Sequence, residues 1–216
     1  MTIKINEIFY SIQGESSHAG RPCIFIRFTG CNLRCSYCDT QDAFEIGESK
    51  TIDEILYEVA QYKAKLIEIT GGEPLQQGKE CLHLIDELLK KGYEILLETS
   101  GSYDISCLPK QVKVILDIKT PDSKMHNHNV WSNLNILNSS SEIKFVLNSE
   151  ADYIWSKEIL QKYLLGINNE IFFSPVTSAV NPKDLANWIC RDCLPVKMQL
   201  QLHKFIWGDE PEGSKN

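Results

Sequence analysis

Short β-rich runs alternate with helical patterns along most of this chain, and this alternation restricts the fold more than any other feature. The runs cover residues 22–29, 66–70, 93–98, 112–118, 142–147, 171–174 and 197–202. The spacing of apolar residues predicts helices over 51–63, 79–91 and about 150–165, and a fourth that begins at Asn181-Pro182. The stretch 120–141 lacks clear periodicity and is expected to form an irregular, exposed connection. Because strands and helices alternate, we predict an α/β fold of parallel β-α units.

Local signals mark the ends of two of these helices. Thr51 and Glu54 have the spacing of a capping box, in which each side chain satisfies a main-chain N–H group of the other residue. Gly92 follows the second helical pattern and suits a left-handed C-terminal cap. We therefore expect the first helix to begin after Thr51 and the second to end before Gly92.

Size and charge exclude several classes of protein. The chain has 216 residues, of which 24% are charged and 43% hydrophobic, and we expect one core domain over residues 1–207 with a short tail over 208–216. Its 22 Lys and Arg against 29 Asp and Glu leave a net charge of -7, which supplies no basic field for nucleic acid. No apolar run approaches the roughly 18 residues that span a bilayer, and the charged N-terminus lacks the apolar core of a signal peptide. We therefore expect a cytoplasmic protein that binds neither nucleic acid nor membrane.

Polar or glycine-containing clusters follow most of the predicted strands at their carboxyl ends. They read GCNLRCSYCDT, TGGEP, ETSG, DIK, SPVT and HK in chain order. Because the carboxyl ends of parallel strands meet at one edge, binding sites in α/β sheets and barrels gather there. The sequence therefore predicts one composite pocket that is built from distant parts of the chain.

Three of the eight cysteines lie in the loop that follows the first of these strands. Cys31, Cys35 and Cys38 have the spacing C-x-x-x-C-x-x-C, and a loop allows their thiolates to converge on a soft metal centre. A 4Fe-4S cluster used only for electron transfer normally has four cysteine ligands, so three leave one iron open to a further ligand. On spacing alone, a structural zinc with a distant fourth ligand such as His126 is the alternative.

Two motifs together make the chain resemble the radical S-adenosylmethionine superfamily: the three-cysteine loop and Gly71-Gly72-Glu73-Pro74 after the second strand. The N-terminal EIFYSIQGE, which ends at Glu15, and the RFTGCNL that begins at Arg27 narrow the resemblance to the 7-carboxy-7-deazaguanine synthase family. Further matching pieces are Cys38-Asp39-Thr40, Glu98-Thr99-Ser100-Gly101, Asp117-Ile118-Lys119 and Gln201-Leu202-His203-Lys204. The resemblance spans nearly the whole chain and implies a reduced partial (β/α) barrel, with cluster and substrate at the carboxyl ends of the strands.

The same resemblance implies a radical lyase. Its substrate would be 6-carboxy-5,6,7,8-tetrahydropterin and its products 7-carboxy-7-deazaguanine and ammonia, on the route to queuosine and other 7-deazapurines. The implied cofactors are a 4Fe-4S cluster, S-adenosylmethionine and Mg2+, with a 5'-deoxyadenosyl radical that abstracts a substrate hydrogen and returns it. The implied partners are a flavodoxin- or ferredoxin-type electron donor and a second copy of the chain in a homodimer. The protein itself would position the substrate, exclude water and compensate charge.

The resemblance also assigns residues to each ligand. Assigned to metals are Cys31, Cys35 and Cys38 for the cluster and Thr40 for magnesium. Assigned to the pterin are Ile12, Gln13, Gly14, Arg27, Thr70 and His203. Assigned to S-adenosylmethionine are Tyr37, Cys38, Asp39, Gly72, Glu73, Asp117, Ile118, Lys119, Ser174, Pro175, Val176 and Thr177. Among these, the planar guanidinium of Arg27 suits the substrate carboxylate, and His203 is expected at the end of the last strand.

Two other functions compete with this interpretation. A glycyl-radical activase has the same cysteine spacing but need not carry the N-terminal stretch or Arg27, and a non-catalytic metal-binding module would not bind S-adenosylmethionine. The chain also departs from the family where Ser16 replaces a glycine, where Asp117-Ile118 replaces Ser-Pro, and where residues 208–216 extend beyond the point at which some members end. Cys190-x-x-Cys193 falls in a predicted helix without a matching second pair, which does not favour a further metal site.

Overall fold

The fold is a single curved sheet in a computed structural model that describes residues 1–164 and 166–208. Within these residues the nine strands follow the order β3-β1-β2-β4-β5-β6-β7-β8-β9. They are β1 (Thr2–Ile12), β2 (Pro22–Phe28), β3 (Glu48–Thr51), β4 (Leu66–Gly71), β5 (Glu94–Thr99), β6 (Lys113–Ile118), β7 (Glu142–Leu147), β8 (Glu170–Pro175) and β9 (Lys197–Met198). β1 pairs antiparallel with β2 and β3, and all pairs from β2 to β9 are parallel. The predicted α/β fold with a parallel sheet is confirmed.

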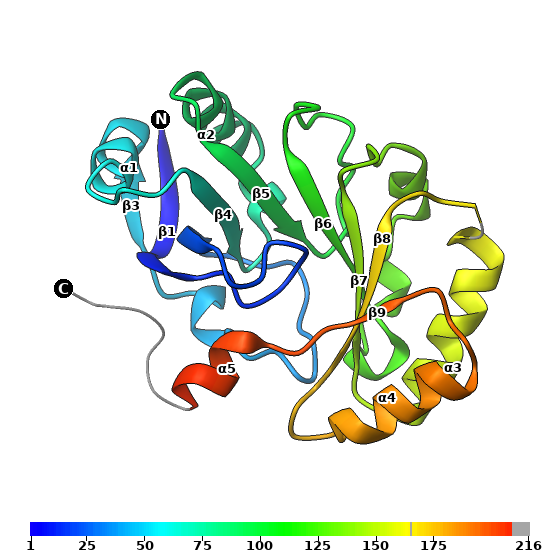
Figure 1. Cartoon of the computed structure of the whole chain (residues 1–216). Helices are drawn as coiled ribbons and strands as arrows, with labels where there is room; N and C mark the ends of the chain where they lie inside the picture. Colours follow the sequence, from blue (N-terminus) through cyan, green and yellow to red (C-terminus); the bar gives the residue numbers. More distant parts are fainter. Residues whose placement is uncertain (165, 209–216) are drawn as a thin grey trace.

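The described residues form five α-helices. They are α1 (Ile52–Val59), α2 (Gly78–Lys90), α3 (Glu150–Ile159), α4 (Pro182–Arg191) and α5 (Leu202–Trp207). In Figure 1, α1 to α4 surround the curved sheet, whereas α5 lies across its open, inner side. The capping box of Thr51 and Glu54 is present at the start of α1, as predicted. The predicted third helix is α-helical only to Ile159 and continues as a π-helical turn over Leu160–Leu164.

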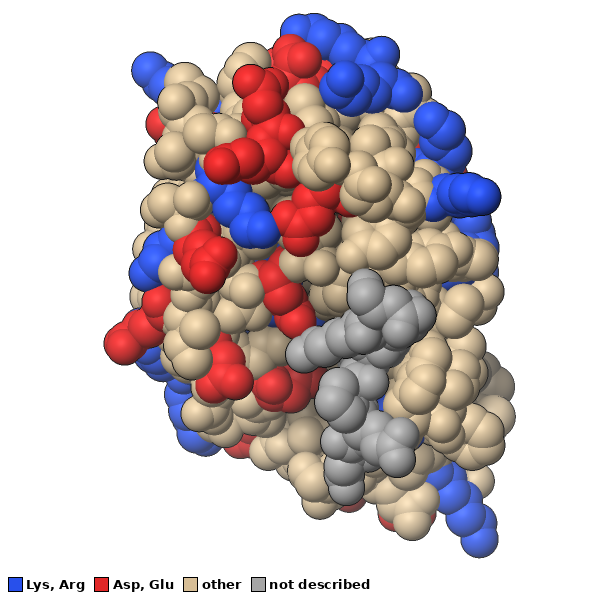
Figure 2. Space-filling view, turned by 90° about the vertical axis from the view of Figure 1, so that its left-hand side faces the viewer, with Lys and Arg blue, Asp and Glu red and all other residues tan. Residues whose placement is uncertain are grey.

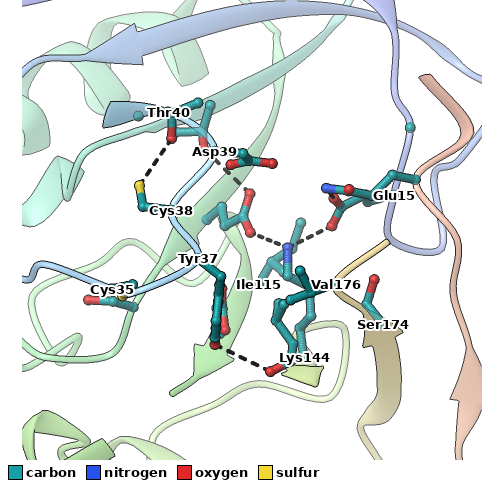
Figure 3. Close-up of a pocket in the computed structure, with 18 of the residues that line it drawn as sticks. Glu15, Cys35, Tyr37, Cys38, Asp39, Thr40, Ile115, Lys144, Ser174 and Val176 are labelled. Atoms are coloured by element: carbon teal, nitrogen blue, oxygen red, sulfur yellow. Dashed lines mark hydrogen bonds and ion pairs between the residues drawn. The ribbon is translucent and has the colours of Figure 1, made fainter. Parts of the chain in front are cut away.

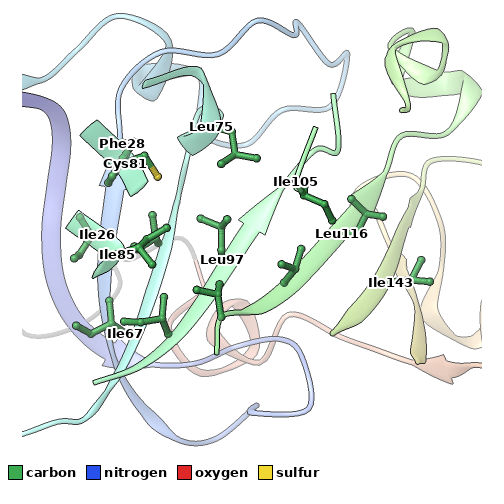
Figure 4. Close-up of a cluster of buried hydrophobic side chains, with 14 of the residues drawn as sticks. Ile26, Phe28, Ile67, Leu75, Cys81, Ile85, Leu97, Ile105, Leu116 and Ile143 are labelled. Atoms are coloured by element: carbon green, nitrogen blue, oxygen red, sulfur yellow. The ribbon is translucent and has the colours of Figure 1, made fainter. Parts of the chain in front are cut away.

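The main core lies between the sheet and its outer helices. Successive residues of a strand point to opposite faces, and in β7 the outward residues Ile143, Phe145 and Leu147 are fully buried. Figure 4 shows side chains of this core, which come from β2, β4, β5, β6, β7 and α2. A smaller apolar cluster occupies the inner side and consists of Phe9, Cys23, Phe25, Leu66, Leu96 and Ile115. Because this cluster fills the inner side toward the amino ends of the parallel strands, polar residues can line the side near their carboxyl ends.

Three elements differ from prediction. The strand β1 was not predicted, because the alternation of buried Ile3 and Ile5 is interrupted by a bulge between Ile5 and Glu7. The predicted strand over 197–202 pairs with β8 only at Lys197–Met198. The connection 120–141 is irregular but not wholly exposed: it forms three 3-10 turns and buries polar side chains such as Asn133. The tail predicted over 208–216 lies outside the described residues except for Gly208.

The surface carries charges of both signs. Figure 2 shows the side that bears α1 and β3, where Asp and Glu side chains gather along the middle and most Lys and Arg lie toward the edges. This distribution agrees with the net charge of -7. Among the described helices, none is long and apolar enough to cross a membrane.

Candidate active site

A cavity of about 860 Å³ opens at the carboxyl ends of the parallel strands, on the inner side of the sheet. The residues assigned from sequence that line it are Gln13, Gly14, Arg27, Cys31, Cys35, Tyr37, Cys38, Asp39, Thr40, Thr70, Gly72, Asp117, Lys119, Ser174, Pro175, Val176, Thr177 and His203. The assigned residues outside its lining are Ile12, Glu73 and Ile118. The predicted composite pocket is therefore present, and it contains most of the residues that the sequence singled out.

The three residues outside the lining have structural reasons for their positions. Ile118 is 3% exposed and points outward into the main core, because it alternates with the inward-facing Asp117. Ile12 ends β1, directly before Gln13. Glu73 is fully buried and accepts hydrogen bonds from the hydroxyls of Thr99 and Ser100. Glu73 therefore ties the turn after β4 to the end of β5, and it does not line the cavity.

The three-cysteine loop begins where β2 ends. Cys31, Cys35 and Cys38 are free thiols that all line the cavity, and Leu33 between them is 1% exposed. The main-chain N–H of Cys38 donates to the carbonyl oxygen of Cys35 at 3.2 Å, which curls the second half of the loop. Figure 3 shows Cys35 and Cys38 on this loop beside the labelled cavity residues. One buried leucine thus anchors a short loop that presents three thiols to one space.

The thiols fit a 4Fe-4S cluster better than an isolated ion. Burial raises the pKa of Cys31 and Cys35, so a bound cationic centre is what would favour their thiolate forms. Among the described residues, no three or more His, Cys, Asp or Glu side chains are placed to hold one metal ion. A cluster takes each thiolate on a different iron, so its ligands need not meet at one point. His126, the alternative zinc ligand, packs edge-on against Trp155 and does not line the cavity.

A second group of assigned residues gathers beside Cys35. The Nζ of Lys119 lies 2.8 Å from a carboxylate oxygen of Asp117, and both side chains are largely buried. Burial opposes the charge on Lys119, but Asp117 together with Cys35 and Tyr37 outweighs it, so the pKa of Lys119 is raised. Burial also raises the pKa of Tyr37 to about 12, and its hydroxyl donates to the carbonyl oxygen of Val146 at 3.3 Å. These groups form a rigid polar wall next to the cysteine loop.

Charged residues that the sequence did not assign also line the cavity. Lys144 on β7 is 6% exposed, and its Nζ contacts the carboxylates of Glu15, at 2.6 Å, and Glu98. Burial would raise the pKa of Glu98, but the ammonium of Lys144 lowers it. Figure 3 shows the ammonium of Lys144 between the two carboxylates. A lysine inside the apolar run EIKFVL is the signal that could have revealed this cluster from sequence.

Arg27 faces the same cavity from β2. Its Nε donates to a carboxylate oxygen of Glu7 at 2.9 Å, and its side chain is 16% exposed. The guanidinium also lies 5.7 Å from the centre of the Phe9 ring. This ion pair engages Nε, and the two terminal nitrogens of the fork form no hydrogen bond with another described residue, so they can donate to a ligand.

Helix α5 crosses the cavity opening and corrects one prediction. His203 does not end a strand: it lies in α5, because the chain leaves the sheet after Met198. The N–H of Leu202 donates to the carbonyl oxygen of Gly14 at 3.0 Å, and the Nζ of Lys204 lies 2.9 Å from a carboxylate oxygen of Asp39. A Cβ on Gly14 would lie 2.0 Å from the His203 ring. Close packing on a glycine thus brings His203 beside the N-terminal stretch.

The second cysteine pair lies elsewhere. Cys190 is in the last turn of α4, and Cys193 follows the helix with a left-handed φ of 48°. Both are exposed and neither lines the cavity. The structure therefore keeps this pair separate from the three-cysteine loop.

Comparison with known proteins places this cavity in a family. Residues 25–163 match the model of the radical SAM superfamily. The chain is 44% identical over 214 residues to the 7-carboxy-7-deazaguanine synthase of Chlorobaculum tepidum, covering 98% of this chain and 97% of that protein. It is 40% identical to the enzyme of the same name from Koribacter versatilis, covering 98% and 100%. The crystal structure of QueE from Escherichia coli matches with a TM-score of 0.79 and 25% identity, covering 94% of this chain and 95% of that one.

These matches run through the three-cysteine loop, the glycine turn after β4 and the strands that carry the inner polar residues. The superfamily implies a 4Fe-4S cluster and S-adenosylmethionine, and the three free thiols at the cavity fit that cluster. The chain therefore belongs to the radical SAM superfamily and, within it, to the 7-carboxy-7-deazaguanine synthase family.

Proposed function

We propose that this protein converts 6-carboxy-5,6,7,8-tetrahydropterin to 7-carboxy-7-deazaguanine and ammonia. One observation carries the proposal: a single cavity contains both the three thiols of the cluster loop and a separate polar floor that can hold a second small molecule. The family relationship supplies the identity of the reaction. Bound together, the cluster and S-adenosylmethionine supply one-electron chemistry that removes a hydrogen atom from the substrate and returns it.

The chain's own residues bind and orient the two ligands. Arg27 offers its terminal guanidinium nitrogens to the substrate carboxylate, a pairing that is bidentate when the planes align. Thr70 pairs with Arg27 in the sheet, one residue before the end of β4, and its hydroxyl lies 3.4 Å from a carboxylate oxygen of Glu98. His203 and Gly14 close the opposite side, since α5 packs on the N-terminal stretch. Substrate is thus held from strand ends and from the helix that crosses the opening, which excludes water from the reacting carbon.

Residues of the cysteine loop and of β6 would hold S-adenosylmethionine. Tyr37, Asp117 and Lys119 form the polar wall next to Cys35, and the ends of β4 and β8 border the same space. Ile12, Ile118 and Glu73 would act through their main chains or through the turns they hold, because their side chains do not line the cavity.

A magnesium ion at Thr40 belongs to the same proposal. The Thr40 hydroxyl lines the cavity and lies 3.9 Å from the sulfur of Cys38, so an ion bound there would lie next to the cluster loop. Mg2+ commonly takes one or two protein oxygens and completes its shell with water and substrate oxygens. Thr40 and the substrate carboxylate supply such a set.

The remaining parts of the proposal concern the assembly. We include a single core domain over residues 1–207, a flavodoxin- or ferredoxin-type electron donor, a homodimer and a cytoplasmic location. They are supported by the family relationship and by the absence of a membrane-spanning helix among the described residues.

An anaerobic assay tests the function. The iron-reconstituted protein is incubated with reductant, Mg2+, S-adenosylmethionine and 6-carboxytetrahydropterin, and 7-carboxy-7-deazaguanine is measured by mass spectrometry. We expect product from the wild type and from Cys107→Ala, an exposed thiol outside the cavity, but none from Cys35→Ala. If 5'-deoxyadenosine forms without the deazaguanine, the radical class stands and the pterin reaction fails, as for a glycyl-radical activase. If neither forms and no cluster assembles, a non-catalytic metal module replaces the proposal.

A further inference from the structure

Glu68 is a buried carboxyl group on the cavity floor with no role in the account above. It lies on β4, is 5% exposed and lines the cavity. In the sheet it is the partner of Phe25 on β2 and of Leu96 on β5, both members of the inner apolar cluster. Phe25 and Ile115 of that cluster also line the cavity. The carboxyl group of Glu68 thus lies beside apolar side chains that could pack against the flat ring of a ligand.

Only one of the two oxygens of this carboxyl group accepts a hydrogen bond from a described residue. The side-chain amide of Gln13 donates to Oε2, whereas Oε1 accepts no hydrogen bond from any residue that the structure describes. Burial and then the neighbouring Glu98 raise the pKa of Glu68 well above its ordinary value. A raised pKa favours the protonated acid in the free protein, whereas a ligand N–H group that donates to Oε1 favours the ionised carboxylate.

The position of Glu68 relative to Arg27 sets the direction of a bound ligand. Arg27 pairs with Thr70 in the sheet, and Glu68 lies two residues below Thr70 on the same inner face, about 7 Å deeper along the strand. A tetrahydropterin carries its carboxylate at one end and a 2-amino-4-oxopyrimidine ring at the other. The carboxylate at Arg27 therefore directs the aminopyrimidine end toward Glu68, between the walls formed by Phe25 and Ile115.

We propose that Glu68 determines the ring specificity of this site, with its Oε1 accepting a hydrogen bond from the 2-amino group of the pterin. The inference rests on the proposed function and goes beyond it by naming the residue that distinguishes an amino group from an oxygen at this ring position. While Glu68 is ionised, a ligand with a carbonyl oxygen there would place acceptor against acceptor and is disfavoured, whereas the protonated acid could donate to that oxygen. Gln13 holds the other carboxyl oxygen and is a positioning residue for Glu68.

Two oxidised ligands that are not turned over test this directly. 6-Carboxypterin carries the 2-amino group, and 6-carboxylumazine carries a carbonyl oxygen in its place. Their affinities for the anaerobic holoenzyme are measured by fluorescence titration at increasing pH, because preference for the amino ligand requires ionised Glu68. We expect the wild type to prefer 6-carboxypterin by about 10- to 100-fold, the cost of an unmatched buried polar pair. In Glu68→Gln the amide can donate to the lumazine oxygen, so the preference is expected to be lost or reversed.

Glu142→Gln is the matched control. Glu142 is another fully buried glutamate on the inner face, but it contacts Lys113 and does not line the cavity, so its loss should leave the ligand preference unchanged. The proposal is overturned if the preference in Glu68→Gln falls by less than about tenfold. Should that variant not fold, equal binding of the two ligands by the wild type overturns it as well. If the wild type turns over 6-carboxytetrahydropterin but binds 6-carboxypterin and 6-carboxylumazine equally, the role of Glu68 is refuted and the proposed function stands.

Discussion

Replacing Gly72 by alanine tests how the cysteine loop is held in place. An added Cβ would lie 1.9 Å from the carbonyl oxygen of Gly30 and 3.1 Å from the Cβ of Cys31. Ordinary contact begins at 3.4 Å, so the main chain of Gly30 must move by about 1.5 Å. That oxygen also accepts a hydrogen bond from the N–H of Glu73 at 2.7 Å, which the movement would break. The substitution therefore acts on the residue directly before the first cluster thiol.

The expected effect has a stability part and a larger functional part. Overpacking of this kind costs about 1–3 kcal/mol, and the lost main-chain hydrogen bond adds about 1 kcal/mol. Because Cys31 moves with Gly30, its thiol leaves the position that the cluster requires, and misplacement by about 1 Å can reduce a rate about 100-fold. We expect Gly72→Ala to bind less iron and to form 5'-deoxyadenosine far more slowly. Iron and sulfide analysis and single-turnover cleavage of S-adenosylmethionine measure both.

Gly92→Ala separates loss of stability from displacement of the loop. Gly92 follows α2 with a left-handed φ of 77°, and no atom lies within 4 Å of an added Cβ. Alanine there costs about 1–2 kcal/mol of backbone strain but does not touch the cysteine loop. We expect a lower melting temperature with a normal iron content. The steric reasoning is refuted if Gly72→Ala binds as much iron and cleaves S-adenosylmethionine as fast as Gly92→Ala.

Three further substitutions test other parts of the structure. Lys144→Met leaves two partly buried carboxylates without their cation, so we expect a loss of up to about 3 kcal/mol in thermal or urea unfolding, partly recovered when Glu98→Gln is added. No recovery would contradict the ion-pair explanation. Tyr153→Phe removes a buried hydroxyl that donates to a main-chain carbonyl of α4 at 2.8 Å, and we expect unfolding at about 1–3 kcal/mol less. Arg21 and His18 hold the pKa of Glu94 at about 2, so the stability that Glu94 contributes is present above pH 4.5 and is lost as the pH falls toward 2. The melting temperatures of Glu94→Gln and the wild type should differ only slightly at pH 7, because the Arg21–Glu94 pair is half exposed. This difference should narrow as the pH falls. A difference that stays constant with pH would contradict the link between the pKa of Glu94 and stability.

Much of the fold follows from local sequence patterns, because regular spacing reports burial. The predicted strand at 66–70 is β4 (Leu66–Gly71), and the predicted helix at 79–91 is α2 (Gly78–Lys90). Prediction was wrong where tertiary contacts override spacing. The chain beyond Met198 has a strand-like pattern, yet the side chain of Gln199 turns to the N-terminal stretch, where it accepts from the N–H of Ser16 at 2.6 Å. That contact joins residues 183 positions apart, and no local pattern predicts it.

The cysteine loop and the cavity floor differ in how visible they are in the sequence. The three thiols lie within eight residues, so their spacing alone indicates a shared ligand. Lys144 and Glu15 lie 129 residues apart and meet only because β7 and the loop after β1 face the same cavity. Residue type and spacing therefore identify the cluster side of the site, whereas the substrate side depends on the order of strands in the sheet.

The direction in which each strand residue points still provides a rule for finding such a floor. A strand that is buried on both faces normally reads as a nearly continuous apolar run. LIEIT, VILDI and IKFVL each contain one charged residue inside such a run, at Glu68, Asp117 and Lys144. The apolar neighbours of each point outward to the helices, so the charged residue must point inward. Because a charge on a dry inner face would be costly, three such interruptions at inner positions of one sheet indicate a polar cavity there. The same reasoning singles out Glu68 as the member that lies deepest among apolar walls, and therefore as the one whose substitution should change what the site accepts.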